Sequence, residues 1–199
     1  MPTETEVKYR VESLREIRDA LRALGGEPIG EVVETDCFFD TPAGDLLRED
    51  RGIRIRRSVS IRGGSCPGVL TYKGPRDPNS RHKVREEVET TVGDVEAAAA
   101  VLRACGLRPV VTIQKRRQRW DMDRCEVSLD ELPLLGTFVE IECESVEQIE
   151  AVRKALSLDG EAITESYLQL LAEHCPRIGE QCDRVTFESC PGCEHRPTE

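Results

Sequence analysis

The sequence predicts an α+β fold in which antiparallel strands form one closed architecture with amphipathic helices packed outside. Three observations predict it. Nearly every strand-like segment alternates charged with apolar residues, the helix-like segments are apolar on one side only, and a strand and helix near the N-terminus recur about eighty residues later. Because each half-sheet alone would leave open edges, we expect two similar β-α-β-β-β halves to intertwine.

The composition indicates a cytoplasmic protein with a core of its own. The chain has 199 residues, 38% of them apolar, and a formal net charge of −10. No apolar run approaches the roughly 20 residues that cross a bilayer, and the N-terminus lacks the basic and apolar regions of a signal peptide. We expect no membrane partner and no nucleic-acid partner, since nucleic-acid-binding proteins usually carry a basic surface.

The first half is predicted from alternation and capping signals. Its elements are, in order, strand 3–11, helix 13–25, strands 31–40, 51–57 and 69–73, and a polar loop at 74–83. Ser13 begins a capping-box pattern, and a glycine pair at 25–26 ends the helix. In the opening strand Glu4, Glu6 and Lys8 share one face, because strand side chains alternate sides.

The second half repeats this order and adds two helices. Its elements are strand 84–91, helix 94–105, strands 110–120, 125–130 and 138–144, and helices that begin at 145 and 164. Ser145 and Gln148 form a second capping box, whereas Thr164 is the predicted cap of the last helix. A turn at 123–124 and a loop at 132–136 separate the last three strands.

Charged side chains occupy one face of nearly every predicted strand. The acidic ones are Glu4, Glu6, Glu87, Glu89, Asp130, Glu140 and Glu142, and the basic ones are Lys8, Arg54, Arg56, Lys73, Arg85, Lys115, Arg117 and, as a further candidate, Arg119. Two arrangements fit: cross-strand ion pairs on a solvated sheet, or a barrel whose lumen holds the charges. Such a lumen would need water, a divalent metal and a strongly anionic ligand, since arginine suits phosphate and carboxylates suit magnesium or manganese.

An ordered set of motifs bears on the choice between a solvated sheet and a barrel with a charged lumen. From the N-terminus to about residue 172 the chain carries Glu4-x-Glu6-x-Lys8, Thr35-Asp36-x-x-Phe39-Asp40-Thr41, Arg54-Ile55-Arg56, Leu70-Thr71-Tyr72-Lys73-Gly74, Arg85-Glu86-Glu87-x-Glu89, Lys115-Arg116-Arg117, Ser128-Leu129-Asp130-Glu131 and the segment 136–142. In this order the set resembles the CYTH superfamily, the triphosphate tunnel metalloenzymes. The first motif alone is weak, because short acidic strings are common.

The resemblance implies a fold and a set of site residues. The fold is a closed eight-stranded antiparallel β-barrel with a charged lumen, the triphosphate tunnel, and helices outside. The implied ligands of Mg²⁺ or Mn²⁺ are Glu4, Glu6, Glu140 and Glu142, with Glu87 and Glu89 as supporting acidic residues of the lumen. The implied triphosphate-binding residues are Lys8, Arg54, Arg56, Lys73, Arg85, Lys115 and Arg117. The implied catalytic residues are Lys8, Lys73 and Asp130.

Within the superfamily, residues 35–41 and 128–142 are most similar to the class IV adenylyl cyclase branch. There the ribose 3′ oxygen of ATP attacks the α-phosphorus, which gives cAMP and pyrophosphate in a phosphorus-oxygen lyase reaction. The alternative is a triphosphatase that hydrolyses inorganic triphosphate, thiamine triphosphate or nucleoside triphosphates in the same site. A non-catalytic polyphosphate or nucleotide sensor ranks third, because the set of charged residues is complete. The sequence leaves the oligomeric state open, with a homodimer as one alternative.

The nine cysteines fall into two groups. Those at positions 37, 66, 105, 125 and 143 are predicted to be small buried hydrophobic side chains with reduced thiols. The others, Cys175, Cys182, Cys190 and Cys193, lie in a segment at 173–199 that follows the predicted CYTH domain at 1–172. Two alternatives stay open for this segment: a zinc site, or a flexible tail with a redox-sensitive thiol pair.

Overall fold

The computed structural model describes residues 3–64, 66–76, 83–175, 178 and 182–188. The strands are β1 (Thr3–Arg10), β2 (Glu27–Asp40), β3 (Gly52–Ser60), β4 (Gly68–Lys73), β5 (Lys83–Val92), β6 (Arg108–Met122), β7 (Cys125–Leu132), β8 (Gly136–Glu142) and β9 (Arg184–Val185). The helices are α1 (Leu14–Ala23), α2 (Asp45–Arg48), α3 (Val95–Ala104), α4 (Val146–Ala155) and α5 (Tyr167–His174).

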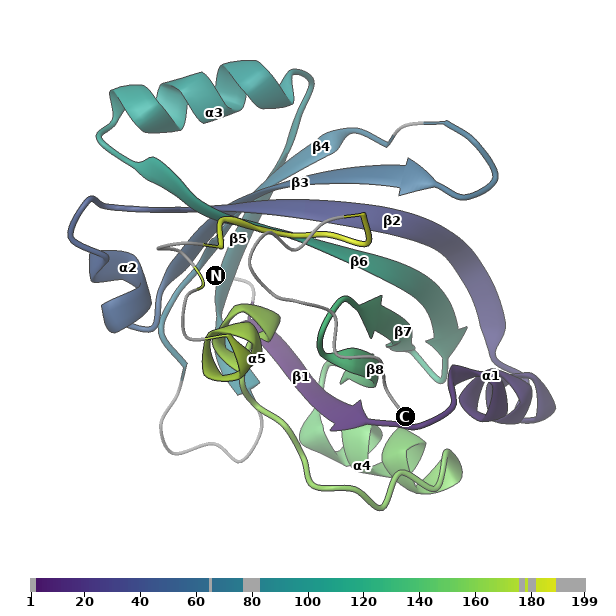
Figure 1. Ribbon diagram of the computed structural model, residues 1–199. Coiled ribbons are helices and arrows are strands. Elements are labelled where there is room, and N and C mark those ends of the chain that lie inside the picture. The colour runs from purple at the N-terminus through teal and green to yellow at the C-terminus, as the bar shows by residue number, and fades with distance from the viewer. Residues whose placement is uncertain (1–2, 65, 77–82, 176–177, 179–181, 189–199) are drawn as a thin grey trace.

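Eight antiparallel strands form one curled sheet (Figure 1). The strand order is β2-β3-β4-β5-β1-β8-β7-β6, with β9 added in parallel to β6. A further antiparallel pairing joins β2 to β6 over most of their length, so the two ends of this order also meet. The predicted eight-stranded antiparallel architecture with helices is therefore confirmed.

The two predicted halves do intertwine. Strand β1 pairs with β5 on one side and with β8 on the other, and both of these partners come from the second half. Strand β5 in turn lies between β4 and β1 of the first half. Each half thus completes the sheet of the other, as the open edges of a single half-sheet would require.

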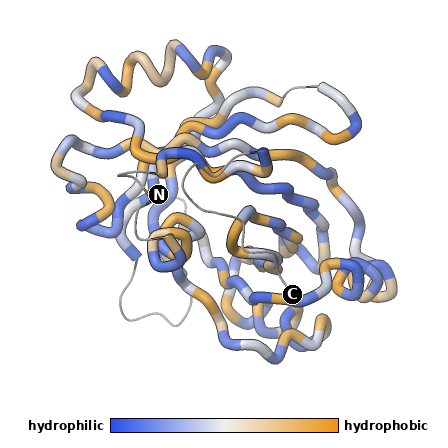
Figure 2. Tube along the Cα trace, viewed as in Figure 1, coloured by the Kyte–Doolittle hydropathy of each residue, from blue (hydrophilic) through white to orange (hydrophobic). Residues whose placement is uncertain are grey.

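The apolar core lies between the outer face of the sheet and the helices. Val7 and Tyr9 are buried on the side of β1 opposite Glu6 and Lys8, and they pack in a cluster with Ile149 of α4. Helix α3 packs on β3 and β4, whereas α4 packs on β1, β7 and β8 (Figure 1). Figure 2 shows the resulting alternation of hydrophilic and hydrophobic residues along the strands. The inner face of the sheet is consequently left to the charged residues.

Two helix starts differ from the prediction. Ser166 caps α5 by accepting a hydrogen bond from the backbone N–H of Gln169, so the cap predicted at Thr164 is wrong. A short helix, α2, lies between β2 and β3, where the sequence analysis gave no helix. The Asp40 carboxylate accepts hydrogen bonds from the backbone N–H groups of Leu46 and Leu47, at 2.9 Å and 3.0 Å, and so satisfies the donors at the start of α2.

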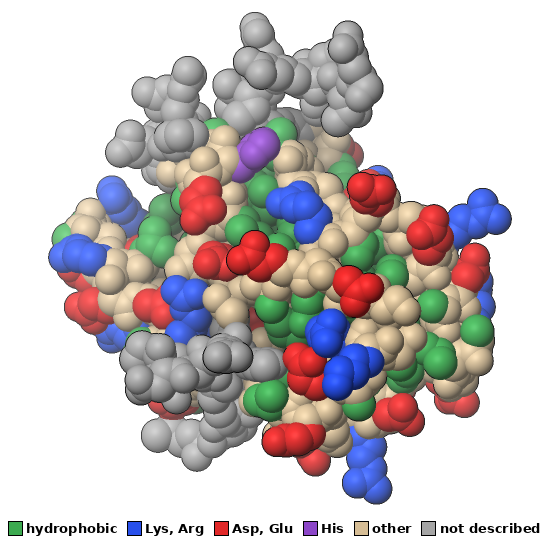
Figure 3. All heavy atoms as spheres, turned by 90° about the horizontal axis from the view of Figure 1, so that it is seen from below, with side chains coloured by type: hydrophobic (Ala, Val, Ile, Leu, Met, Phe, Trp, Pro, Cys, Tyr) green, Lys and Arg blue, Asp and Glu red, His purple; other side chains and the backbone are tan. Residues whose placement is uncertain are grey.

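The surface carries charges of both signs. On the face seen in Figure 3, acidic and basic side chains lie interspersed among apolar ones. None of the helices in the described residues has the length and apolar content needed to span a membrane.

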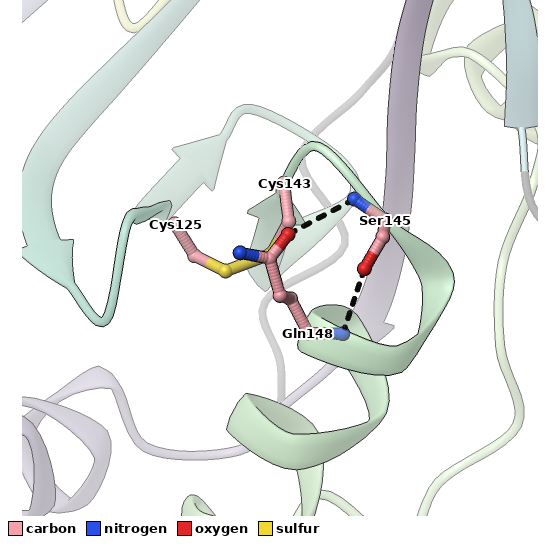
Figure 4. Close-up of a disulfide and its surroundings, with 4 residues drawn as sticks. All are labelled: Cys125, Cys143, Ser145 and Gln148. Atoms are coloured by element: carbon pink, nitrogen blue, oxygen red, sulfur yellow. Dashed lines mark hydrogen bonds between the residues drawn. A yellow bond between two sulfur atoms is a disulfide. The ribbon is translucent and has the colours of Figure 1, made fainter.

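The cysteine prediction was wrong at four positions. Cys125 and Cys143 form a disulfide between the ends of β7 and β8, next to the capping box of α4 (Figure 4). The capping box itself, formed by Ser145 and Gln148, is as predicted. Cys66 and Cys105 are exposed, because neither lies on a face that a helix or strand covers.

The described residues beyond position 172 contact the sheet. Cys175, Cys182 and Val185 are buried in an apolar cluster with Val111 and Leu171. The predicted boundary at 172 remains a prediction. Of the predicted zinc ligands, Cys190 and Cys193 lie outside the described residues, and within the described ones no metal-binding group of three His, Cys, Asp or Glu side chains occurs.

Candidate functional site

The inner face of the curled sheet lines a cavity of about 830 Å³. The predicted triphosphate-binding residues all line it: Lys8, Arg54, Arg56, Lys73, Arg85, Lys115 and Arg117. The predicted acidic residues that line it are Glu6, Glu87, Glu89, Glu140 and Glu142. Glu4 lies in β1 opposite Arg85, and its side chain is outside the described part of the structure. The structure therefore brings together side chains from strands that are far apart in the sequence.

Lys8 is held between two carboxylates. Its Nζ lies 2.9 Å from Glu6 Oε1 and 2.9 Å from Glu140 Oε2, and Lys8 and Glu6 are each only 2% exposed. Burial would lower the pKa of Lys8, but Glu140 and Glu6 raise it above its ordinary value. Lys8 is therefore a fixed ammonium between these two side chains.

Asp130 anchors a second cluster. Arg117 donates to both Asp130 oxygens, at 2.7 Å and 2.6 Å, and to Glu140 Oε1 at 2.8 Å. Burial would raise the pKa of Glu140, but Arg117 and Lys8 hold it well below its ordinary value. The bidentate geometry fixes the plane of the guanidinium. Asp130 itself is fully buried, so its carboxylate lies behind Arg117.

Two acidic residues of β2, Glu34 and Asp36, complete the cavity. The sequence analysis assigned neither to the site, although Asp36 stands in the motif at 35–41. Glu34 Oε2 lies 2.9 Å from Arg56 Nη1 and 3.2 Å from Lys115 Nζ. Asp36 accepts a bidentate pair of hydrogen bonds from Arg56, at 2.7 Å and 2.8 Å. Burial would raise the pKa of Glu34, but Lys115 and Arg56 lower it to about 2. The period-two spacing of Glu34 and Asp36 was the signal that could have found them.

A third set of ion pairs lies on β3, β4 and β5. Lys73 Nζ lies 2.5 Å from Glu87 Oε2, and Arg54 Nη2 lies 3.6 Å from Glu89 Oε1. The Thr71 hydroxyl donates to Glu89 Oε1 at 2.6 Å. This side of the cavity is more open to solvent, since the Glu89 side chain is 46% exposed. Arg54 can therefore exchange Glu89 for another partner at lower cost than Lys8 or Arg117 can exchange theirs.

The acidic end of the cavity suits a divalent metal in its donor chemistry. Partial burial and the nearby carboxylates of Glu6 and Glu140 raise the pKa of Glu142 to about 7, although part of its surface is open to solvent. Glu126, which sequence reasoning also missed, adds to this repulsion. Carboxylate oxygens are the ligands that magnesium and manganese prefer, and a cation would relieve the repulsion. In the described residues no three carboxylates stand together as a ready metal group, because Lys8 holds Glu6 and Glu140.

Helix α5 supplies the remaining lining. Tyr167 lies at its first position and donates its hydroxyl to Asp130 Oδ2 at 2.8 Å. Gln169 and Ser166 also line the cavity. The alternating charges of the strands did not predict that residues of this helix belong to the site. The position of α5 depends on contacts with residues that are distant in the sequence.

The CYTH domain family matches residues 2–167 of the chain. The adenylate cyclase CyaB of Aeromonas hydrophila is 31% identical over 177 residues, which cover 88% of this chain and 80% of the relative. MJ0240 of Methanocaldococcus jannaschii, named as a candidate adenylate cyclase, is 28% identical over 177 residues, which cover 84% of this chain and 97% of the relative. Each match thus covers at least four fifths of the relative.

Solved structures share the fold. The PH1819 protein of Pyrococcus horikoshii OT3 superposes with a TM-score of 0.74 at 29% identity, covering 85% of this chain and 98% of that one. A candidate adenylyl cyclase from Hippeastrum, HpAC1, superposes with a TM-score of 0.65 at 20% identity, covering 85% of this chain and 95% of that one. HpAC1 is described as having a dominant triphosphatase activity. At its identity, the likeness shows the fold alone.

Proposed function

The chain belongs to the CYTH family, and we propose that it is a divalent-metal-dependent enzyme that converts ATP to cAMP and pyrophosphate inside a closed tunnel. CYTH triphosphate tunnel metalloenzymes use divalent metal ions and act on triphosphates. The observation that carries the proposal is the convergence of seven predicted basic side chains on one cavity that also holds Glu6, Glu140 and Glu142.

The pairing of β2 with β6 supports the tunnel. It joins the two ends of the strand order, and the cavity is lined by residues of all eight antiparallel strands. A lumen of this kind gives a polyanion several cations at once while excluding most of the solvent. Electrostatic contacts are stronger there than on an open surface.

The ion pairs suggest how ligands would enter. Lys8 and Arg117 are each engaged by carboxylates, which phosphate oxygens would replace as the triphosphate binds. Glu6 and Glu140, released from Lys8, would then hold the metal with Glu142 and Glu4. The bound metal supplies Lewis-acid stabilisation of the charge that develops on the leaving pyrophosphate. Of the three predicted catalytic residues, Lys8 and Lys73 would contact the phosphates. Asp130, which is buried behind Arg117, would act by holding that guanidinium in place.

The cyclase assignment is supported by the two relatives named as adenylate cyclases. The alternative is a triphosphatase that hydrolyses inorganic triphosphate, thiamine triphosphate or nucleoside triphosphates in the same cavity. The activity described for HpAC1 favours keeping this alternative, because that protein shares the fold and is also named as a cyclase candidate. The two reactions differ in whether the ribose 3′ oxygen attacks the α-phosphorus or water attacks the γ-phosphorus.

The deciding experiment incubates the full chain separately with ATP and with inorganic triphosphate, each with Mg²⁺ and with Mn²⁺. We expect cAMP and pyrophosphate from ATP, measured by chromatography and ³¹P NMR. If ATP yields only ADP and phosphate while triphosphate turns over quickly, the triphosphatase alternative holds. If neither compound turns over under any condition, the enzymatic proposal is wrong.

A matched pair of variants tests the site itself. Arg117 points into the cavity, whereas Arg116 is exposed and pairs with Glu131 on the outer face. We expect Arg117→Gln to lower kcat/KM by about 100-fold or more, since it removes a charged donor from the proposed phosphate site. Arg116→Gln should leave turnover unchanged. Equal activity of the two variants, both verified as folded by circular dichroism, would contradict the placement of the site.

A further inference from the structure

Tyr167 reaches into the cavity from outside the eight-stranded sheet. Its ring centroid lies 5.3 Å from Lys8 Nζ and 5.3 Å from Lys115 Nζ. The two lysines come from β1 and β6, which are separated by β8 and β7 in the sheet. The electron-rich ring attracts ammonium groups placed at this distance. One side chain therefore contacts two cations from separate strands.

The Tyr167 hydroxyl acts on a third charged group. It donates to Asp130 Oδ2 at 2.8 Å, and Lys115 Nζ lies 3.6 Å from the same oxygen. Arg117 also donates to this oxygen, at 2.6 Å, and to Asp130 Oδ1. The hydroxyl of Tyr167 therefore shares Asp130 Oδ2 with Arg117 and competes with Lys115 for it.

The position of the Tyr167 ring is set by the chain around it. The segment before α5 is tied to β1 by two backbone hydrogen bonds between Lys8 and Ile163, at 3.1 Å and 2.9 Å. Ser166 caps the helix, and Gln169 Nε2 donates to Asp50 Oδ1 at 3.3 Å. Phe138 meets the ring edge-on, with the centroids 5.3 Å apart. Few other orientations are open to the side chain.

The Tyr167 hydroxyl resists ionisation. Burial of the hydroxyl and the carboxylates of Asp130 and Glu140 raise the pKa of Tyr167 well above its ordinary value. The side chain is therefore a permanent hydrogen-bond donor, which favours a role in geometry over one in proton transfer.

We propose that Tyr167 is a positioning residue of the triphosphate site: its ring holds the ammonium groups of Lys8 and Lys115 in place for phosphate oxygens, and its hydroxyl competes with Lys115 for Asp130. The proposal rests on the proposed function, because it requires a triphosphate to bind at these lysines. It assigns a binding role to a residue of α5, outside the charged strands.

The test measures binding of inorganic triphosphate by calorimetry in EDTA, where no metal-dependent turnover occurs. Tyr167→Phe keeps the ring and removes the hydroxyl, and we expect about tenfold weaker binding because Asp130 can then compete for Lys115. Tyr167→Leu also removes the ring and should weaken binding about fivefold further. Tyr9→Phe is the matched control, since Tyr9 is a buried tyrosine on the opposite face of β1.

A double-mutant cycle separates positioning from general stability. In an Asp130→Asn background, Tyr167→Phe should cost almost nothing further, because its partner is gone. If Asp130→Asn does not fold, Lys115→Met takes its place in the cycle. Wild-type binding together with unchanged affinity in both Tyr167 variants overturns the positioning role alone. Absence of wild-type binding, both in EDTA and with Mg²⁺, overturns the proposed function instead.

Discussion

The carboxylates of the cavity serve the fold as well as the site. Glu140 accepts from both Lys8 and Arg117, and all three side chains are at least nine-tenths buried. Removing one partner of a buried ion pair usually costs about 3–5 kcal/mol, because the other charge is left without compensation. Alanine substitutions at such positions would therefore mix loss of stability with loss of function, and substitutions near the cavity mouth give cleaner information.

Glu142 is one such position. Its pKa is raised from 4.5 to about 7 by partial burial and by the carboxylates of Glu6 and Glu140. The folded state thus binds this proton more tightly than the unfolded state, so the ionised group costs stability as the pH rises from 4.5 past 7. In EDTA at about pH 8, we expect Glu142→Gln to stabilise the fold, by less than about 1 kcal/mol because solvent screens the exposed carboxylate.

The gain should fall as the pH drops below 7 and disappear below about pH 4.5, where the carboxyl becomes protonated in both states. Thermal unfolding of wild type and variant across this range measures it. Glu144→Gln provides the control, since Glu144 is exposed and lies just beyond β8. A pH-independent difference between wild type and Glu142→Gln would contradict the repulsion argument.

At the scale of elements, the β7–β8 hairpin explains the disulfide. Leu132 pairs with Gly136 at its closed end, and this register places Cys125 opposite Cys143, with their Cα atoms 4.6 Å apart. The bond closes a loop with a sequence separation of 18 residues. A cross-link over a loop of this length stabilises a protein by about 3 kcal/mol, chiefly by restricting the unfolded chain.

We expect Cys125→Ser with Cys143→Ser to lower the free energy of unfolding by about 2–4 kcal/mol. Urea unfolding measures this difference, and treatment of the wild type with a phosphine reductant should lower stability similarly. Cys66→Ser is the control, because Cys66 is an exposed thiol. A wild-type chain whose stability is insensitive to the reductant would show that the bond does not form in solution.

The same hairpin shows how far sequence reasoning can go. The loop at 132–136 was predicted, and once its register is known, the pairing of Cys125 with Cys143 follows by counting along two antiparallel strands. The charged faces of the strands were also predictable, because the alternation of charged and apolar residues can be seen within each strand segment alone. The contacts of Tyr167 were not, since they depend on where α5 docks against strands more than thirty residues away in sequence.

At the scale of the whole molecule, the repeat accounts for the architecture. Counterparts in the two halves pair with each other, β1 with β5 and β2 with β6, both antiparallel. Such pairings relate the halves by an approximate two-fold axis through the cavity. The recurrence of strand and helix in the sequence predicted this relation between the halves. Whether the charged faces of the strands point outward or inward could be decided only once the positions of the helices were known.

Charge balance is also a property of the whole cavity. Among the described residues that line it, nine are acidic and nine are basic. The cavity is therefore close to neutral without ligands, and either ligand alone would leave one set of charges without partners. A triphosphate would displace carboxylates from Lys8 and Arg117, and a metal would draw the same carboxylates away from these cations.

It follows that metal and triphosphate should bind cooperatively, each raising the affinity of the other by the same factor. Couplings between sites are typically about 1–3 kcal/mol, or roughly 5–150-fold in affinity. We expect the thermal stabilisation by Mg²⁺ and inorganic triphosphate together to exceed the sum of the two separate effects. For this measurement Glu131→Gln is a suitable control, since Glu131 pairs with Arg116 on the outer face and does not line the cavity. Strictly additive stabilisation would mean that the carboxylates and the basic residues act independently, which the shared contacts of Lys8 argue against.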